Sequence, residues 1–180
     1  RWTDDHITDI AGHRVPLLVA GDSAGGNLAA VTAIRARDRG GPAIAHQILV
    51  YPVTDSDLDT DSYHDPENQL LLTREAMQWF FDHYVPDRED RKQPDVAPAR
   101  ADRLDGLPPA IVVTAEHDPL RDEGEAYAEA LKAAGVHVSL KRMDGQMHGF
   151  FQMVGVLPGQ AQAMEHIARS VQDRLDRQTA

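Results

Sequence analysis

One hexapeptide, Gly-Asp-Ser-Ala-Gly-Gly at positions 21–26, constrains the fold of this chain more than any other feature. It directly follows the apolar run 17–20 and opens into a helix-compatible stretch. Between a strand and a helix, Gly-x-Ser-x-Gly forms a sharp turn that projects the serine hydroxyl away from the backbone. We expect Gly21 and Gly25 to supply the space for this turn and Ser23 to be a nucleophile.

The segment also partly matches two other glycine-rich motifs, but it lacks the residues that perform the chemistry of each. Gly21 and Gly26 have the spacing of the outer glycines of a phosphate-binding loop, but Asn27 and Leu28 stand where its lysine and metal-binding hydroxyl must be. In a dinucleotide-binding fingerprint, Ser23 would occupy the place of the second glycine. The nucleophile reading of the motif is therefore favoured.

Composition narrows the class of protein. The chain has 180 residues, 42% of them hydrophobic, which is enough for one globular domain with a substantial core. A net charge of −11 argues against binding to nucleic acid or to an anionic membrane surface, and no apolar run approaches a membrane span. With no cysteine, a cytosolic location is expected.

Because the first predicted strand begins well after Arg1, we expect the chain to be the later part of a longer protein.

Alternating strands and helices predict an α/β fold with a mostly parallel sheet flanked by helices. The third strand is a continuous apolar run, as expected for a strand that is buried on both faces of a parallel sheet. The predicted strands are Leu17–Ala20, Gln47–Tyr51, Ala110–Ala115 and Val136–Lys141.

Helices are predicted after the third and the fourth strand. The first of them begins with Asp122 and Glu125 in a capping-box-like arrangement and ends at Gly135 in a left-handed conformation. The last helix of the chain is expected to bury one stripe of side chains. That stripe consists of Met164, Ile167, Val171 and Leu175.

The stretch 54–103 interrupts the alternation and is expected to be an inserted cap or lid within a catalytic domain that spans 1–180. It contains one helix, capped by Thr73, with an apolar stripe that either lines a substrate pocket or docks the helix on the sheet. Its acidic loop 55–61 lacks the glycine and the glutamate that a calcium loop requires, so we expect a solvated charge run. The helical stripe consists of Met77, Phe80, Phe81 and Tyr84.

A serine hydroxyl needs a base to take its proton, and that base needs an oriented acid behind it. Asp118 lies just past the carboxyl end of the third strand, and His148 lies on a glycine-flanked loop after the fourth. Because active sites of open α/β sheets lie at the carboxyl ends of strands, Ser23 is expected at the same edge. The three side chains can therefore converge, in the chain order Ser, Asp, His.

Three further carboxylates lie near these residues. Glu116 and Asp122 compete with Asp118 for the role of the acid. Glu116 is still close to strand geometry, and Asp122 is accounted for as a helix cap, so Asp118 is favoured. Asp22 is expected to brace the turn of the nucleophile by hydrogen bonding.

Five segments in this order resemble the hormone-sensitive-lipase-like esterases, which are α/β-hydrolases with an N-terminal and an inserted helical cap. The resemblance implies hydrolysis of small, short-acyl carboxylic esters through an acyl-enzyme, with no metal or organic cofactor. It implies that Ser23 is the nucleophile, that His148 is the general base and then acid, and that Asp118 orients the imidazole. The segments are GDSAGGN at 21–27, YP at 51–52, LPPA at 107–110, DPLRDEG at 118–124 and HGF at 148–150.

The same resemblance places substrate contacts at Leu120 and Phe150, next to the catalytic candidates. One motif of the family is missing: nothing in this chain matches the His-Gly-Gly-Gly segment that donates amides to the oxyanion. The amide of Ala24 is the oxyanion donor that the sequence offers.

Two alternative functions stay open at this point. Plant hormone receptors that resemble the same family bind a ligand without hydrolysing it, but they lack the base, whereas His148 is present here. An amidase or a lactonase could use the same three residues. A homodimer formed through the last strand and helix is a further expectation.

Overall fold

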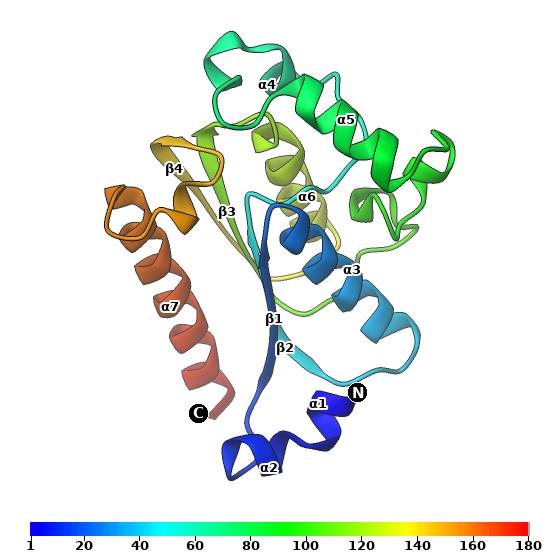
Figure 1. The fold of residues 1–180 in the computed structure, drawn as a ribbon. Coiled ribbons are helices and arrows are strands. Elements are labelled where there is room, and N and C mark those ends of the chain that lie inside the picture. Colours follow the sequence, from blue (N-terminus) through cyan, green and yellow to red (C-terminus); the bar gives the residue numbers. More distant parts are fainter. Residues whose placement is uncertain (180) are drawn as a thin grey trace.

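The computed structural model describes residues 1–179 and shows a four-stranded parallel sheet with strand order β1-β2-β3-β4 (Figure 1). All four predicted strands are present, but β1 and β3 run two residues further than expected at their carboxyl ends, and β4 runs six residues further. The strands are β1 Leu17–Asp22, β2 Ile44–Val50, β3 Ala110–His117 and β4 Val138–Met147.

Helices cover both faces of this sheet, so the α/β class predicted from the sequence is confirmed. Figure 1 shows α3 and α6 on one side of the sheet, α7 on the other, and α4 and α5 above the carboxyl ends of the strands. The helices are α1 Trp2–Asp5, α2 Ile7–Ala11, α3 Ala24–Asp38, α4 Asp61–His64, α5 Arg74–Tyr84, α6 Arg121–Ala133 and α7 Pro158–Thr179. Short 3₁₀ turns lie at Pro66–Asn68, Asp90–Lys92, Pro98–Arg100 and Phe150–Gln152.

Two hydrophobic layers hold the helices to the sheet, one on each face. Val112 of β3 is fully buried in the layer shared with α3 and α6, whereas its neighbours Ile111 and Val113 are buried in the layer under α7. Successive side chains of a strand point to opposite faces, so a strand with helices on both sides must be apolar throughout. Burial on both faces therefore explains why β3 is an uninterrupted apolar run in the sequence.

Two details of the helices differ from the sequence expectation. Helix α6 has Leu120 at its N-cap with no side-chain cap, so Asp122 does not cap it as predicted. Its end at Gly135, with φ of +84°, agrees with the prediction. In α7 the residue that faces the sheet is Ala163, which is fully buried, while Met164 is 47% exposed. The predicted stripe was placed one residue off at its first position.

The stretch between β2 and β3 packs as a separate hydrophobic cluster above the sheet. Thr73 caps α5 as predicted, its hydroxyl accepting a hydrogen bond from the amide of Ala76. Asn27 of α3 fastens the segment at two points, because its side-chain amide donates to the carbonyl oxygens of Val53 and Val96. The cluster consists of Val53, Leu58, Tyr63, Leu72, Met77, Phe81 and Leu120.

Glu123 ties the start of this segment to α6 from a fully buried position. Its Oε1 accepts hydrogen bonds from the amides of Thr54 and Asp55 at 2.7 and 3.2 Å, and its Oε2 accepts one from the Tyr63 hydroxyl at 3.0 Å. Burial raises the pKa of the Glu123 carboxyl to about 8, although the three donors favour its charged form.

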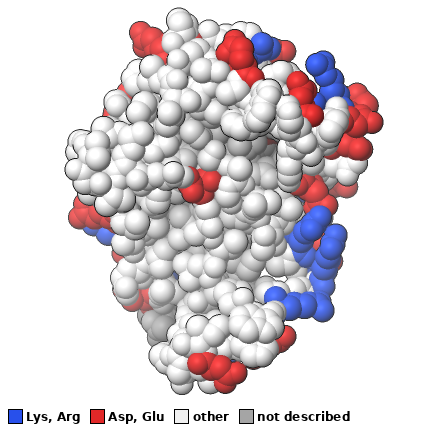
Figure 2. Space-filling view, viewed as in Figure 1, with Lys and Arg blue, Asp and Glu red and all other residues white. Residues whose placement is uncertain are grey.

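Charged side chains are unevenly spread over the surface. On the face drawn in Figure 2, uncharged residues fill most of the centre, and Lys, Arg, Asp and Glu gather toward the edges. None of the helices that the structure describes combines the length and the hydropathy needed to cross a bilayer.

Glu123 should make the stability of the fold depend on pH. Between the ordinary carboxyl pKa of 4.5 and about 8, the folded state keeps a proton that the unfolded chain has released. The free energy of unfolding therefore falls as the pH rises through this window. Glu123→Gln, which is always neutral and keeps the Oε1 acceptor, should reduce this loss by up to about 1.4 kcal/mol per pH unit. Urea unfolding at several pH values between about 6 and 9 measures this pH dependence of the free energy of unfolding.

The matched control is Glu125→Gln on the same helix. Arg142 holds the pKa of the Glu125 carboxyl below its ordinary value, so this group stays charged over the whole range. We expect the control to keep the wild-type pH dependence. Equal slopes for Glu123→Gln and the wild type would contradict the assignment.

Candidate active site

Ser23 sits on the turn between β1 and α3 in a strained backbone conformation, with φ of +55°. Two hydrogen bonds fix the turn to the residues at and after the end of β2: the amide of Ser23 donates to the Val50 carbonyl, and the amide of Val53 donates to the Ser23 carbonyl. A non-glycine residue with positive φ persists where its surroundings enforce it, and such residues cluster at functional sites. Its position supports the selection of Ser23 from the motif.

The glycines around Ser23 play different roles from those predicted. A Cβ on Gly21 would lie 2.1 Å from the carbonyl oxygen of Gly25, so only glycine fits there. A Cβ on Gly25 would meet nothing within 4 Å, so the expectation that Gly25 supplies space is wrong. The second close approach is at Gly26, whose Cβ would lie 2.8 Å from that of Pro52.

Ser23, His148 and Asp118 form one hydrogen-bonded chain. His148 Nε2 lies 3.0 Å from Ser23 Oγ, and His148 Nδ1 lies 2.7 Å from Asp118 Oδ2. Asp118 is fully buried, and its other oxygen accepts a hydrogen bond from the amide of Leu120. Carboxylate, imidazole and hydroxyl in this order are the arrangement that activates a serine.

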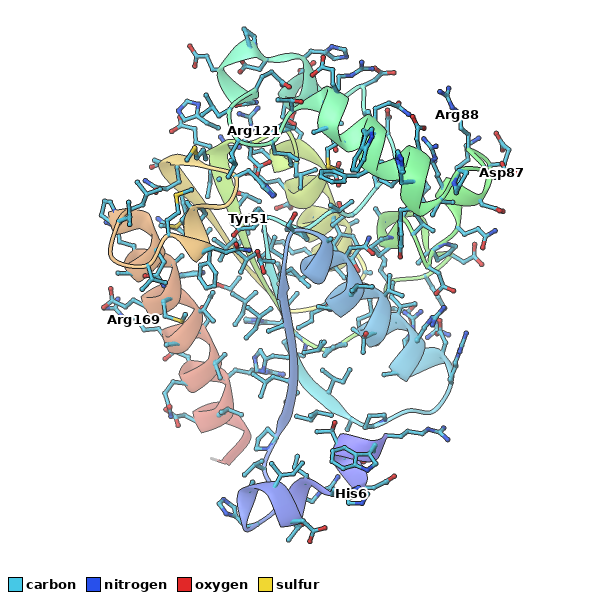
Figure 3. All side chains as sticks on the ribbon, viewed as in Figure 1. His6, Tyr51, Asp87, Arg88, Arg121 and Arg169 are labelled. Atoms are coloured by element: carbon cyan, nitrogen blue, oxygen red, sulfur yellow. The ribbon has the colours of Figure 1, made fainter. Side chains whose placement is uncertain are left out.

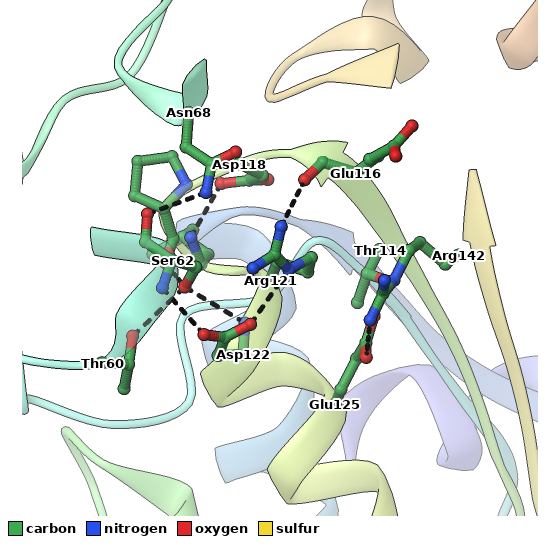
Figure 4. A network of polar contacts seen from close by, with 12 residues as sticks. Thr60, Ser62, Asn68, Thr114, Glu116, Asp118, Arg121, Asp122, Glu125 and Arg142 are labelled. Carbon is green, nitrogen blue, oxygen red and sulfur yellow. Dashed lines mark hydrogen bonds and ion pairs between the residues drawn. The ribbon is translucent and has the colours of Figure 1, made fainter. Parts of the chain in front are cut away.

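Glu116 and Asp122, the competing acids, are engaged elsewhere (Figure 4). The Glu116 carboxylate accepts a hydrogen bond from the amide of Gly145, and its backbone carbonyl accepts the bond from Arg121 that Figure 4 draws. Asp122 accepts one from the amide of Ser62 and one from Arg121. The Ser62 hydroxyl also donates to the carbonyl of Pro119 at 2.6 Å, which joins α4 to the loop that carries Asp118.

Tyr51 supports the imidazole from the side, a contact that the sequence analysis did not identify. Its ring lies 4.6 Å from the ring of His148, centroid to centroid, and it is labelled in Figure 3 at the centre of the molecule. The Tyr51 hydroxyl donates to Asp22 at 3.3 Å, and Gln152 donates to the same carboxylate oxygen at 2.6 Å. Burial and the charge of Asp22 raise the pKa of Tyr51, which therefore stays a neutral donor. Asp22 braces the turn, as predicted.

An apolar cavity of about 550 Å³ opens beside the serine. Its walls come from the start of α3, the segment that follows β2, and α5. All four residues of the α5 stripe line the cavity, as one of the two sequence readings proposed; Met77 and Phe81 are also buried in the hydrophobic cluster of the inserted segment, while Phe80 and Tyr84 are half exposed. The lining residues are Ser23, Ala24, Asn27, Leu28, Val53, Leu72, Met77, Phe80, Phe81, His83, Tyr84 and Val96.

Leu120 and Phe150, the expected substrate contacts, do not line this cavity. Both side chains are fully buried. Leu120 belongs to the cluster of the inserted segment, and Phe150 packs under α7 and against Tyr51. They pack behind the walls of the cavity and behind the loop that carries His148, and neither is among the residues that line the cavity.

Ala24, by contrast, lines the cavity as the first residue of α3. The first amides of a helix have no partner within the helix, and the N-terminus of the helix favours negative charge. The backbone at Ala24 is thus placed beside Ser23 with the polarity that an oxyanion needs.

Comparison with known proteins agrees with this geometry. The family described as alpha/beta hydrolase fold matches residues 1–152. Carboxylesterase NlhH of Mycobacterium tuberculosis is 44% identical over 167 residues, which cover 91% of this chain and 52% of that protein. An arylesterase of Saccharolobus solfataricus is 37% identical over 150 residues, which cover 83% of this chain and 49% of the relative.

Solved structures of esterases share the fold. A fungal esterase from Rhizomucor miehei superimposes with a TM-score of 0.89 at 44% identity, covering 97% of this chain and 55% of the other. The chain spans about half the length of the curated relatives that it matches. On the family match and these identities, the chain belongs to the alpha/beta hydrolase fold family, as its resemblance to the hormone-sensitive-lipase-like esterases predicted.

Proposed function

We propose that this chain carries the nucleophile, base and acid of a serine carboxylesterase that acts on small, short-acyl esters. The observation that supports the proposal most is the hydrogen-bonded chain from Ser23 through His148 to Asp118 beside an apolar cavity. The names of similar proteins, carboxylesterase, arylesterase and ethyl acetate hydrolase, point to the same reaction class.

In the proposed reaction, Ser23 Oγ attacks the ester carbonyl while His148 Nε2 takes the hydroxyl proton. The imidazolium that forms is stabilised by Asp118, and the amide of Ala24 donates to the oxyanion. The carbon–oxygen bond to the alcohol then breaks, and His148 returns the proton to the leaving alcohol. Water, deprotonated by the same imidazole, hydrolyses the acyl-enzyme and releases the carboxylic acid. The protein groups in these steps are the side chains of Ser23, His148 and Asp118 and the backbone amide of Ala24, and the proposed reaction needs no cofactor.

The alternatives differ in how well the site supports them. A ligand-binding module without catalysis would not need His148 Nε2 at 3.0 Å from the serine hydroxyl, and this contact favours an enzyme. An amidase or a lactonase would use the same three residues, and hydrolysis of amides and lactones is therefore the second activity to assay. The cytosolic location and the homodimer stay predictions.

Ser23→Ala should abolish ester hydrolysis. Loss of the nucleophile removes the covalent step, which in a serine hydrolase costs on the order of 10⁴–10⁶ in kcat. The measurement is turnover of p-nitrophenyl acetate by the full-length protein, with circular dichroism to verify the fold. Ser56→Ala, in the loop that follows β2, is the matched control and should keep wild-type turnover. More than a few per cent of residual activity in Ser23→Ala would refute the nucleophile assignment.

Activity should fall on acidification, because a protonated His148 cannot accept the serine proton. The pH dependence of kcat/KM should show the loss of a single essential base as the pH is lowered. Ellipticity recorded at each pH separates this effect from unfolding. A flat profile between about pH 5 and 8 would exclude His148 as the base.

The size of the cavity near Ser23 should set the acyl-chain preference. Leu28 lies one turn after Ala24 on α3, lines the cavity and is 57% exposed, so a larger residue there should be accommodated without refolding the core. Leu28→Trp should lower the ratio of octanoate to acetate turnover by about tenfold or more, because a few methylenes lose their apolar contacts. Leu28→Ala is the control and should not lower this ratio. Equal ratios in both variants would place the acyl chain elsewhere.

A further inference from the structure

The pairing of β3 with β4 is interrupted near the carboxyl ends of the two strands. Ala115 is paired with Met143, and the next pair along the ladder is His117 with Met147. One residue of β3 therefore faces three residues of β4, at positions 144–146. Such a β-bulge leaves residues out of the regular ladder and bends the strand, and bulges are frequent next to active sites.

This bulge decides which residue comes to lie opposite the acid. The pair that follows it is succeeded at once by Asp118 on one chain segment and His148 on the other, and these two side chains hydrogen-bond at 2.7 Å. If the register before the bulge continued unbroken, Gln146 would lie opposite Asp118 instead. Because three residues face one, the bulge shifts β4 by two residues and so brings the imidazole to the carboxylate.

Glu116 is the single residue of β3 that faces the bulge, and its side chain binds the bulge at the middle position. Its Oε2 accepts a hydrogen bond from the amide of Gly145 at 2.6 Å. Gly145 has φ of +67°, a left-handed conformation that glycine adopts readily. Backbone amides need a partner wherever the ladder is interrupted, and the carboxylate supplies one here. The side chain therefore holds the bulge in its bent shape.

The other contacts of Glu116 do not explain this side chain. His117 Nε2 lies 3.9 Å from the carboxylate, which is beyond hydrogen-bond distance. In Figure 4 the Glu116 carboxylate points away from Asp118, the acid that binds His148. Glu116 is also not among the residues that line the cavity beside Ser23. An effect of Glu116 on the reaction must therefore pass through the bulge.

We infer that Glu116 is a positioning residue for the general base. Its hydrogen bond to Gly145 keeps the bulge closed, which keeps His148 in register with Asp118. The inference rests on the proposed function, since it assigns a role within the same site. Without the acceptor the bulge opens, and the imidazole moves relative to Ser23 Oγ, which lies 3.0 Å from its Nε2. A misplacement of about 1 Å at a reacting group can cost about 10²-fold in rate.

Glu116→Met in the full-length protein tests this role. Methionine has nearly the length of glutamate but no strong acceptor, so kcat for p-nitrophenyl acetate should fall by about tenfold or more. KM should stay near its wild-type value, because Glu116 does not line the cavity. Glu116→Gln keeps an oxygen acceptor and should retain most of the wild-type kcat. An unchanged kcat in Glu116→Met, or equal losses in both variants, would overturn the inference.

Asp144→Leu is the matched control, because it removes an exposed carboxylate from the same bulge. It should keep the wild-type kcat, and a loss equal to that of Glu116→Met would show a general charge effect and refute the role. The Glu116 side chain is 42% exposed, so its replacement leaves no buried cavity, and circular dichroism verifies the fold. If Glu116→Met does not fold, Glu116→Val takes its place, since β-branched residues suit strands.

A second measurement does not depend on ester turnover. The proton held between His148 Nδ1 and Asp118 should give a far-downfield resonance whose position reports the geometry of this hydrogen bond. We expect it to shift or broaden in Glu116→Met and to stay in place in Glu116→Gln and Asp144→Leu. If the wild type hydrolyses no ester, the proposed function fails, but the resonance still tests the register. An unchanged resonance in Glu116→Met overturns the inference in either case.

Discussion

The close approach of the backbone at Gly21 and Gly25 is the contact on which the rest of the structure depends. It brings the end of β1 against the first turn of α3, and no Cβ could be accommodated at Gly21. The turn therefore holds Ser23 at a positive φ, and α3 packs back onto one face of the sheet. Hydrogen bonds between Ser23 and residues Val50 and Val53 then fix the position of the turn relative to β2. Ser23 therefore lies at the carboxyl edge of a parallel sheet. Only at that edge can loops after β3 and β4 reach it.

The sequence predicted the elements and the triad well because both depend on local, repeated patterns. Buried parallel strands are apolar throughout, and parallel strands with short connections bring their carboxyl ends together. Asp118 and His148 each follow such a strand, so their convergence on Ser23 could be foreseen without knowing any distance. The parts that failed depend on distant contacts. The need for glycine at 26 comes from Pro52, and Asp122 is drawn from a capping role to Ser62, 60 residues earlier in the chain.

Proximity in sequence to Asp118 or His148 was a poor guide to which residues line the cavity. Leu120 and Phe150 adjoin the acid and the base, yet each turns inward and fills the space behind the loop that it belongs to. The cavity is instead walled by residues at least 24 positions from either, on α3 and on the segment between β2 and β3. Periodicity did identify the apolar stripe of α5, but it reports only which side chains share a face. It does not report that this whole face lines a cavity and that two of its residues are also buried in the cluster of the inserted segment.

The two buried histidines at opposite ends of the sheet differ in how their ring nitrogens are satisfied. His148 has both ring nitrogens engaged, one with Asp118 and one with Ser23. His46 is more deeply buried, but its Nδ1 has no partner among the described residues. Desolvating a polar atom without a partner destabilises a fold, so hydrogen bonding offsets the burial of His148 more fully than that of His46.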